Sequence, residues 1–185
     1  ALVQFNNNSS QYFSEIVFVG HGIVDSVYDD YAEVDVRGKA VLMLDGAPSN
    51  YKPKRGGFMS PSGTFAKITN AQKKGAVAIL MVGGNFPRRP TSATGNMYTE
   101  LYKEAQTPNT YFISEKTAEL IAGSSWTDWK TKGKSSQVKP VLVKTKTGLE
   151  FQKKIQFLES SNVLGIVEGT DKKDEWLVVT AHYDH

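Results

Sequence analysis

The sequence predicts a β-rich α/β fold, and two observations support this fold class. Two short apolar runs, at residues 40–45 and 76–82, flank a segment with helical spacing at residues 62–74. A strand, a helix and a strand joined by short connections are the signature of a β-α-β unit. Further β-rich runs at residues 15–20 and 110–113 are bounded by turn-forming residues, which is typical of strands. We therefore expect a sheet that contains a β-α-β unit.

The first predicted helix covers residues 62–74. Ser62 can cap its N-terminus, and Phe65, Ile68 and Ala71 fall on one stripe that would face the core. Gly75 is placed to end the helix in a left-handed conformation.

A second helix is predicted over residues 115–122. Ser114 would cap it and Gly123 would close it, with Leu120 and Ile121 facing the core.

The last part of the chain predicts two pairs of strands. Alternation at residues 141–147, a glycine at 148 and apolar residues two or four apart at 151–157 predict a hairpin with one apolar face. Residues 163–168 and 176–181 predict a second pair of strands, which a polar turn separates. The run at 176–179 reads as a buried strand, typical of the parallel strands of α/β sheets.

Composition excludes several classes of function. The net charge of +3, from 22 basic and 19 acidic residues, is too small to imply nucleic acid or an anionic membrane as a partner. The chain has no cysteine, which excludes disulfides, thiolate metal sites and a cysteine nucleophile. No apolar run approaches the roughly 20 residues of a transmembrane helix, and the first residues do not read as a signal peptide. Serine-hydrolase and phosphate-loop motifs are also absent from the sequence.

The residues that could carry chemistry stand at the end of the terminal apolar run. In an extended segment, residues two apart point to the same side, so His182 and Asp184 would share a face. His182 could then bind a metal, while Asp184 accepts its second N–H and orients the ring. Tyr183 and His185 would pack or face solvent. Taken alone, a His-x-Asp pattern is more often an ordinary surface turn. His21, between two glycines, is read as structural.

These residues resemble a known family. The block Asn162-Val163-x-Gly165-x-x-Glu168-Gly169, followed by Glu175-x-x-Val178-Val179-x-Ala181-His182-Tyr183-Asp184-His185, resembles the start of the catalytic domain in secreted, zinc-dependent aminopeptidases related to glutamate carboxypeptidase and the transferrin receptor. The middle of the chain resembles the protease-associated domain that those enzymes carry as an insert. The matching segments are residues 16–23, 28–31, 36–41, 73–76 and 113–118.

The resemblance implies a fold and a division of the chain. Residues 1–14 would be a leading linker, and residues 15–148 a swivelling β/β/α protease-associated domain. Residues 149–185 would be the first strands of an α/β zinc-peptidase domain. The active site of the family holds two Zn²⁺ ions, with His182 as the first ligand and Asp184 as the catalytic-site carboxylate that orients it. The other ligands lie downstream in the family, so this chain alone is not expected to bind zinc stably or to hydrolyse peptides.

The resemblance also implies partners and a location. The substrate would be a peptide or protein, and the inserted domain would shape access to the active site or bind a protein partner, with the loop at residues 83–100 as the first place to look. The family implies an extracellular or periplasmic location. Two alternatives stay open: a non-catalytic interaction module whose parent lost its zinc ligands, and a free-standing ligand-binding α/β domain.

Overall fold

The computed structural model describes residues 6–26, 28–53, 60–83, 86, 107–154, 159 and 161–182. The chain divides into two compact units, Ala1–Lys153 and Lys154–His185, and each is described by itself. No helix in the described ranges is long and apolar enough to cross a membrane. The predicted domain boundaries at residues 14 and 148 remain predictions.

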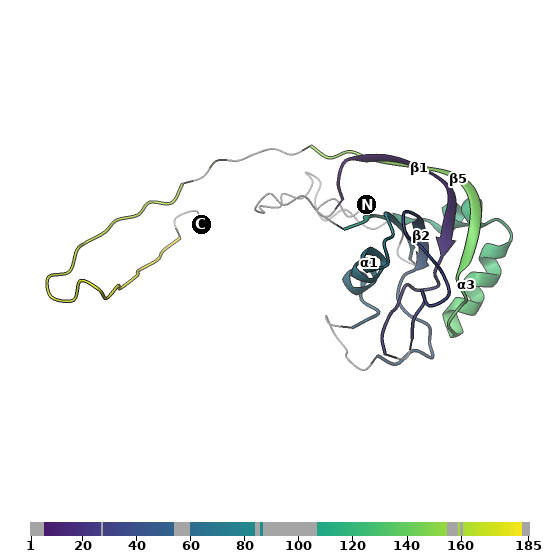
Figure 1. Ribbon diagram of the computed structural model, residues 1–185, viewed down its shortest axis with the longest axis horizontal. Helices are drawn as coiled ribbons and strands as arrows, with labels where there is room; N and C mark the ends of the chain where they lie inside the picture. Colours follow the sequence, from purple (N-terminus) through teal and green to yellow (C-terminus); the bar gives the residue numbers. More distant parts are fainter. Residues whose placement is uncertain are drawn as a thin grey trace. The chain divides into compact units, whose positions relative to one another are not determined.

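The first unit is built around one mixed, mostly parallel sheet (Figure 1). Within the described residues its strands lie in the order β4-β3-β2-β1-β5. Neighbouring strands among β1 to β4 run parallel, whereas β5 runs antiparallel to β1. The strands are β1 (Ser9–Phe18), β2 (Ala40–Leu44), β3 (Ala78–Val82), β4 (Asn109–Ile113) and β5 (Val141–Phe151); the helices are α1 (Thr64–Lys73), α2 (Glu115–Ala122) and α3 (Ser125–Ser135). The α/β fold and the β-α-β unit β2-α1-β3 are therefore confirmed.

Helices cover the sheet on both faces. Side chains alternate between the two faces of each strand, so β2 and β3 are buried along their whole length. On one face, α1 contributes Ile68 and Ala71 to a cluster with Val41, Met43 and Ile79. On the other face, α2 and α3 contribute their side chains to a second apolar cluster. The members of that cluster include Phe18, Leu42, Leu80, Ala118 and Trp126, with the ring of Trp129 stacked on Phe18 at 5.1 Å.

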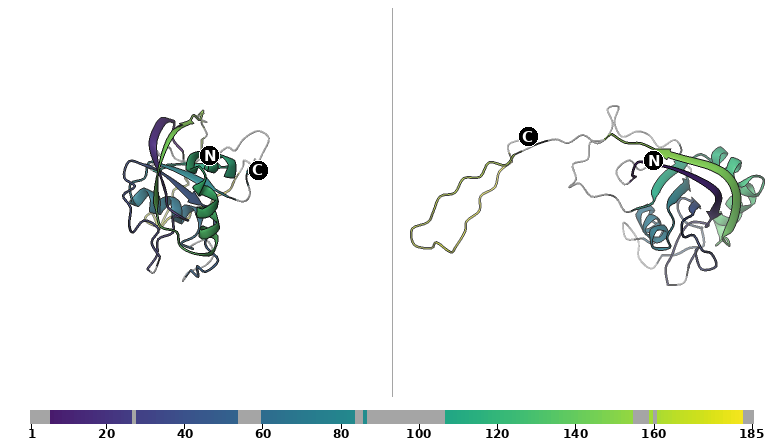
Figure 2. Two further views of the ribbon diagram at one scale, coloured as in Figure 1. Left: turned by 90° about the vertical axis from the view of Figure 1, so that its right-hand side faces the viewer. Right: turned by 45° about the horizontal axis from the view of Figure 1, so that its top comes forward.

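The long strands β1 and β5 form a curved ribbon that extends well beyond the rest of the sheet (Figure 2). β1 pairs with β2 over only three residues, at Ile16 to Phe18, but with β5 along nearly its whole length. The segment before β1 binds β4 instead: the amide of Asn6 donates to the carbonyl of Thr110 at 3.1 Å and accepts from its N–H at 2.8 Å. These bonds satisfy backbone groups of an edge strand that would otherwise need another partner.

The predicted turn at Gly148, and with it the hairpin at residues 141–157, is wrong, although residues 155–157 of its second arm lie outside the described residues. β5 continues through Gly148 as one strand and pairs with β1, where Gly148 lies opposite Tyr12. A Cβ at Gly148 would lie 3.1 Å from Cε1 of Tyr12, so the glycine makes room for a cross-strand aromatic ring rather than for a turn. β1 also begins at Ser9, so part of the segment read as a linker is strand.

The predicted stripe of α1 is partly wrong. Ile68 and Ala71 are buried as expected, but Phe65 is 50% exposed and Lys67 is fully buried. The N-cap is Gly63, without a side-chain cap, instead of Ser62. The termination at Gly75 is confirmed, with φ at 85°.

The prediction for α2 is largely confirmed. Ser114 accepts a hydrogen bond from the N–H of Thr117 at 3.1 Å, and Gly123 ends the helix at a φ of 65°. Ile121 packs against the core, but Leu120 is 80% exposed, so that part of the prediction is wrong. The loop predicted at residues 83–100 lies almost wholly outside the described residues.

Candidate functional site

Of the predicted metal-site residues, the structure describes His182. This residue belongs to the second unit and is exposed. Tyr183, Asp184 and His185 lie outside the described residues. The pairing of His182 with Asp184 on one face therefore stays a prediction.

The donor set in the described part of the chain does not by itself fit a zinc centre. Zinc sites in proteins use three or four side-chain ligands. Across the described ranges, no group of three or more His, Cys, Asp or Glu side chains could hold a metal ion. A zinc site that includes His182 would need ligands from outside these residues.

The two apolar runs before His182 are not buried strands. No β-ladder among the described residues includes residues 163–167 or 176–179. Their large apolar side chains are between 73% and 98% exposed. The polar turn between them is present, with the N–H of Glu175 donating to the carbonyl of Lys172 at 3.1 Å. The runs have the composition of buried strands, but no strand or helix among the described residues of the second unit covers them.

A buried polar cluster lies in the first unit, where β1 and β2 end. Asp30 is fully buried, and its Oδ2 accepts hydrogen bonds from the N–H of His21 at 3.2 Å and of Ile23 at 2.9 Å. Lys67 is also fully buried; its Nζ donates to the carbonyl of Leu44 at 3.1 Å and to that of Gly46. Asp30 thus fixes the loop after β1, and Lys67 caps the end of β2.

His21 connects this cluster to α3. Its Nε2 lies 3.0 Å from the carbonyl oxygen of Gly133. Because a carbonyl oxygen only accepts, Nε2 carries the hydrogen of the bond. Gly133 also makes room for Leu44 of β2, since a Cβ there would lie 2.6 Å from Cδ1 of Leu44.

Burial is the main cause of the pKa shifts of Asp30, Lys67 and His21. It raises the pKa of Asp30 to about 6, although the N–H groups of Ile23 and His21 oppose the shift. It lowers the pKa of Lys67 to about 8, with Asp45 and Asp30 opposing the shift. It also lowers the pKa of His21 below its usual value. Such shifts are frequent at active sites, but these side chains are closed off from solvent and bonded to backbone groups. The cluster is best explained as structural: its hydrogen bonds fix the backbone where β1 and β2 end.

His21 is structural, as its place between two glycines predicts, whereas the buried roles of Asp30 and Lys67 were not predicted. The Gly-His-Gly sequence directly after a buried strand was the available signal for a tight, buried loop. Lys67 stands one position before Ile68 and four before Ala71, so helical spacing also places it on the buried side of α1.

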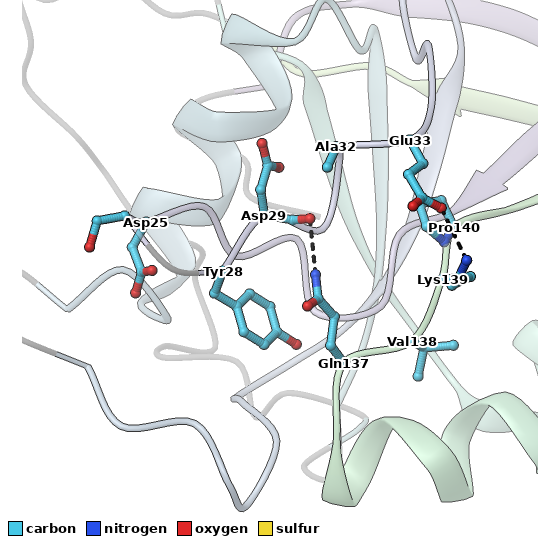
Figure 3. Close-up of a pocket in the computed structure, with 10 residues that line it drawn as sticks. Asp25, Tyr28, Asp29, Ala32, Glu33, Gln137, Val138, Lys139 and Pro140 are labelled. Carbon is cyan, nitrogen blue, oxygen red and sulfur yellow. Dashed lines mark hydrogen bonds and ion pairs between the residues drawn. The ribbon is translucent and has the colours of Figure 1, made fainter.

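A surface pocket of about 590 Å³ lies beside this cluster (Figure 3). It is formed by the loop at residues 25–33 and by residues 137–140, which precede β5. The amide of Gln137 donates to the carbonyl of Asp29 at 2.9 Å and joins the two walls.

The carboxylates of this pocket are already paired. The hydroxyl of Tyr51 donates to Asp25 at 2.5 Å, and Lys74 lies 3.1 Å from Asp29. Glu33 pairs with Lys139 at 3.5 Å. The pocket therefore combines a polar rim with the ring of Tyr28, without a concentrated negative charge.

Comparison with known proteins finds a partial likeness among solved structures. No family model matches the chain, and no curated protein matches it. Among solved structures, it is similar to an aminopeptidase from Aneurinibacillus sp. strain AM-1, at a TM-score of 0.39 and 20% sequence identity. The match covers 78% of this chain and 26% of that one, so the chain spans about a quarter of the length of that aminopeptidase.

Proposed function

We propose that this chain is the protease-associated domain and the first part of the catalytic domain of a two-zinc aminopeptidase. In this proposal the first unit is a swivelling β/β/α domain that shapes substrate access or binds a protein partner. The second unit supplies the first strands of the peptidase domain. The substrate is a peptide or protein, and the location is extracellular or periplasmic.

One observation carries the proposal: the block from Asn162 to His185. An apolar run leads directly into His182 and Asp184, which are spaced to share one face of an extended segment. In open α/β sheets, ligands bind beyond the carboxyl ends of the strands, where these residues would lie. The exposure of residues 163–167 and 176–179 also supports it, because runs of this composition are normally buried inside a larger sheet.

The chain's own residues would have two roles at that site. The imidazole of His182 would be a ligand, and the carboxylate of Asp184 would accept its second N–H, fix its tautomer and raise its basicity. When bound, zinc supplies Lewis-acid activation of a carbonyl group and of a water molecule. The remaining ligands are not among the described residues, so no further step is assigned to this chain.

The test uses the longer protein that the proposal implies. We expect His182→Ala to abolish peptide hydrolysis and to lower the zinc content measured by elemental analysis. Asp184→Asn should lower metal affinity or activity by about 10–100-fold, because it removes a partner that orients the ligand. Lys172→Ala is the matched control: its side chain is exposed in the same unit and pairs with Glu175 at 3.2 Å, so activity and zinc content should not change. Wild-type turnover in His182→Ala would reject the proposal.

A second candidate function is a non-catalytic interaction module. The pocket between the residue 25–33 loop and residues 137–140 favours it, because it lies wholly within the first unit and needs no metal. The gene sequence that follows His185 separates the two functions. A Glu-Glu pair and a second histidine within roughly 200 residues, an ordinary domain length, support the peptidase, and a continuation without them supports the module.

A further inference from the structure

We propose that the pocket between residues 25–33 and residues 137–140 binds a lysine side chain of a peptide or of another protein. In this proposal Asp30 and Tyr28 hold the ammonium group at the floor of the pocket, and the hydrocarbon stem lies along its apolar wall. The inference does not depend on the proposed peptidase function, because the pocket and the residues beneath it lie within the first unit.

Asp30 has one carboxylate oxygen that the fold does not use. Its Oδ2 accepts from the N–H groups of His21 and Ile23, whereas its Oδ1 is buried without a hydrogen-bond partner among the described residues. Oδ1 lies on the side of the pocket: a Cβ on Gly20 would be 3.2 Å from Oδ1 and 3.6 Å from the carbonyl oxygen of Val138, a lining residue. A buried carboxylate oxygen without a donor is rare in folded proteins, and it indicates a partner that binds there.

The hydroxyl group of Tyr28 is a second polar group of this kind. Tyr28 lines the pocket, and its hydroxyl is buried without a hydrogen-bond partner in the described part of the chain. Burial and the neighbouring Asp30 together raise the pKa of this hydroxyl, which places the two side chains near each other. The floor of the pocket therefore has two adjacent oxygens that can each accept a hydrogen bond.

The side chain of Gln137 separates these oxygens from the open pocket. It reaches from the opposite wall into the space between Asp29 and Tyr28, where its amide donates to the carbonyl of Asp29 at 2.9 Å (Figure 3). Burial raises the pKa of Asp30, and the Gln137 amide is among the groups that oppose this shift, so it also lies close to Asp30. Gln137 is exposed, so rotation of its side chain opens a path to Oδ1 for a charged donor.

A lysine side chain fits this site in charge and in shape. An ammonium group carries three donors and no acceptor, and the site offers Oδ1 of Asp30, Oη of Tyr28 and Oε1 of Gln137. A charged donor makes a stronger bond to a carboxylate than a neutral amide does. The four-carbon stem can pack on the ring of Tyr28 and on Val138 and Pro140, which also line the pocket.

The rim of the pocket favours a cation over an anion. Of the described residues that line it, three are acidic and one is basic: Asp25, Asp29 and Glu33 against Lys139. Their side-chain partners already occupy the three carboxylates. The rim therefore attracts a positively charged group through its overall charge, while the specific bonds form at the floor.

The first test is a calorimetric titration of the 185-residue chain at pH 7 with two tripeptides that are blocked at both ends. One tripeptide has a central lysine; the other has a central norleucine, which keeps the four-carbon stem and lacks the ammonium group. The lysine peptide should bind, and the norleucine peptide should bind about 10–100-fold more weakly, as expected for the loss of hydrogen bonds to a charged group. Equal affinities, or no binding of the lysine peptide, would overturn the proposal.

The second test places the site with three variants. Asp30→Asn should weaken binding of the lysine peptide by about 10–100-fold, because the amide nitrogen would replace Oδ1 and present a donor to the ammonium group. Tyr28→Phe keeps the ring and should weaken binding by about 2–10-fold. The matched control is Asp128→Asn, which removes an exposed carboxylate of α3 that pairs with Lys132 at 2.8 Å and does not line the pocket. This control should bind like the wild type.

Urea unfolding of Asp30→Asn shows whether a loss of binding comes from a loss of fold, and this variant should be at least as stable as the wild type. An equal loss of affinity in Asp30→Asn and Asp128→Asn would reduce the effect to overall charge and overturn the proposal. The longer protein provides the last comparison. Binding by the 185-residue chain but not by the longer protein would also overturn the proposal, because the protein's own residues would then cover the pocket.

Discussion

Replacing Asp30 with asparagine tests the account of the buried polar cluster most directly. Asparagine keeps the size of the side chain and an oxygen that can accept from the N–H groups of His21 and Ile23, at 3.2 Å and 2.9 Å in the native protein. It removes the negative charge, which burial makes unfavourable. Oδ1 of Asp30, moreover, is buried without a hydrogen-bond partner among the described residues. We therefore expect Asp30→Asn to stabilise the first unit at neutral pH.

The size of the effect follows from the pKa of Asp30. Burial raises this pKa from 3.8 to about 6. Between these values the folded protein keeps the proton while the unfolded chain has lost it. The folded state then binds more protons, so this group lowers the free energy of unfolding as the pH rises through that window. At roughly 1.4 kcal/mol per pH unit, the total loss is about 3 kcal/mol. The variant does not titrate at this position and lacks this loss.

The assay is urea unfolding of wild type and Asp30→Asn from pH 4 to pH 7, followed by the fluorescence of the buried Trp126 in the first unit. The difference in unfolding free energy should be small near pH 4 and should grow to about 3 kcal/mol in favour of the variant by pH 7. Lys67, the nearby buried cation, is charged in both proteins across this range. A difference that stays constant with pH, or a variant that is less stable at pH 7, would refute the reasoning.

Three further predictions concern the same unit. Lys67→Met should lower the unfolding free energy by about 2 kcal/mol at pH 7, because it removes the buried donor that the carbonyl groups of Leu44 and Gly46 share, and the carbonyl of Leu44 is buried. Between pH 8 and pH 10 the folded state has released the Lys67 proton and the unfolded chain still holds it, so the unfolding free energy of the wild type should rise with pH. Lys67→Met should abolish this rise, which urea unfolding at both pH values would show. Gly133→Ala should lower the stability of the first unit by about 1–3 kcal/mol in thermal unfolding, because the new Cβ would lie 2.6 Å from Leu44. This loss should occur even though alanine is the better helix former. Combining Gly133→Ala with Leu44→Val should recover part of the loss. Ser114→Ala should cost about 1 kcal/mol of stability by removing the cap of α2, whereas Ser124→Ala should have little effect because the N-cap of α3 makes no side-chain hydrogen bond.

Local sequence patterns predicted the strands and helices that are specified by their own apolar runs, caps and terminating glycines. The runs of β2 and β3 are apolar throughout, and α2 carries its cap at Ser114 and its terminator at Gly123. Each of these features acts through neighbouring residues, so the amino-acid order alone shows it. α3 carries weaker signals, with glycine and several polar residues inside the helix. It is held by the burial of Trp126, which depends on the opposite face of the sheet.

Contacts between distant residues decided the features that the sequence did not predict. Gly148 lies inside a strand because Tyr12 lies opposite it. Lys67 is buried because the carbonyl groups at the end of β2 accept its hydrogen bonds. The candidate metal residues follow the same rule, since His182 and Asp184 would acquire a function only from ligands elsewhere. Their spacing can be read from the sequence, but their partners cannot.

The two units differ in how far their apolar side chains are buried. In the first unit, the apolar residues of β2 and β3 are buried, and the buried side chains of Asp30 and Lys67 are hydrogen-bonded. In the second unit, the most apolar residues are nearly fully exposed. A sequence of this kind is suited to a covered position, and the peptidase proposal places it among the remaining strands of a catalytic domain. In the longer protein, Val178→Lys should then lower the unfolding free energy of that domain, because the lysine would be buried without a partner. A longer protein that this substitution leaves as stable as the wild type would contradict the placement.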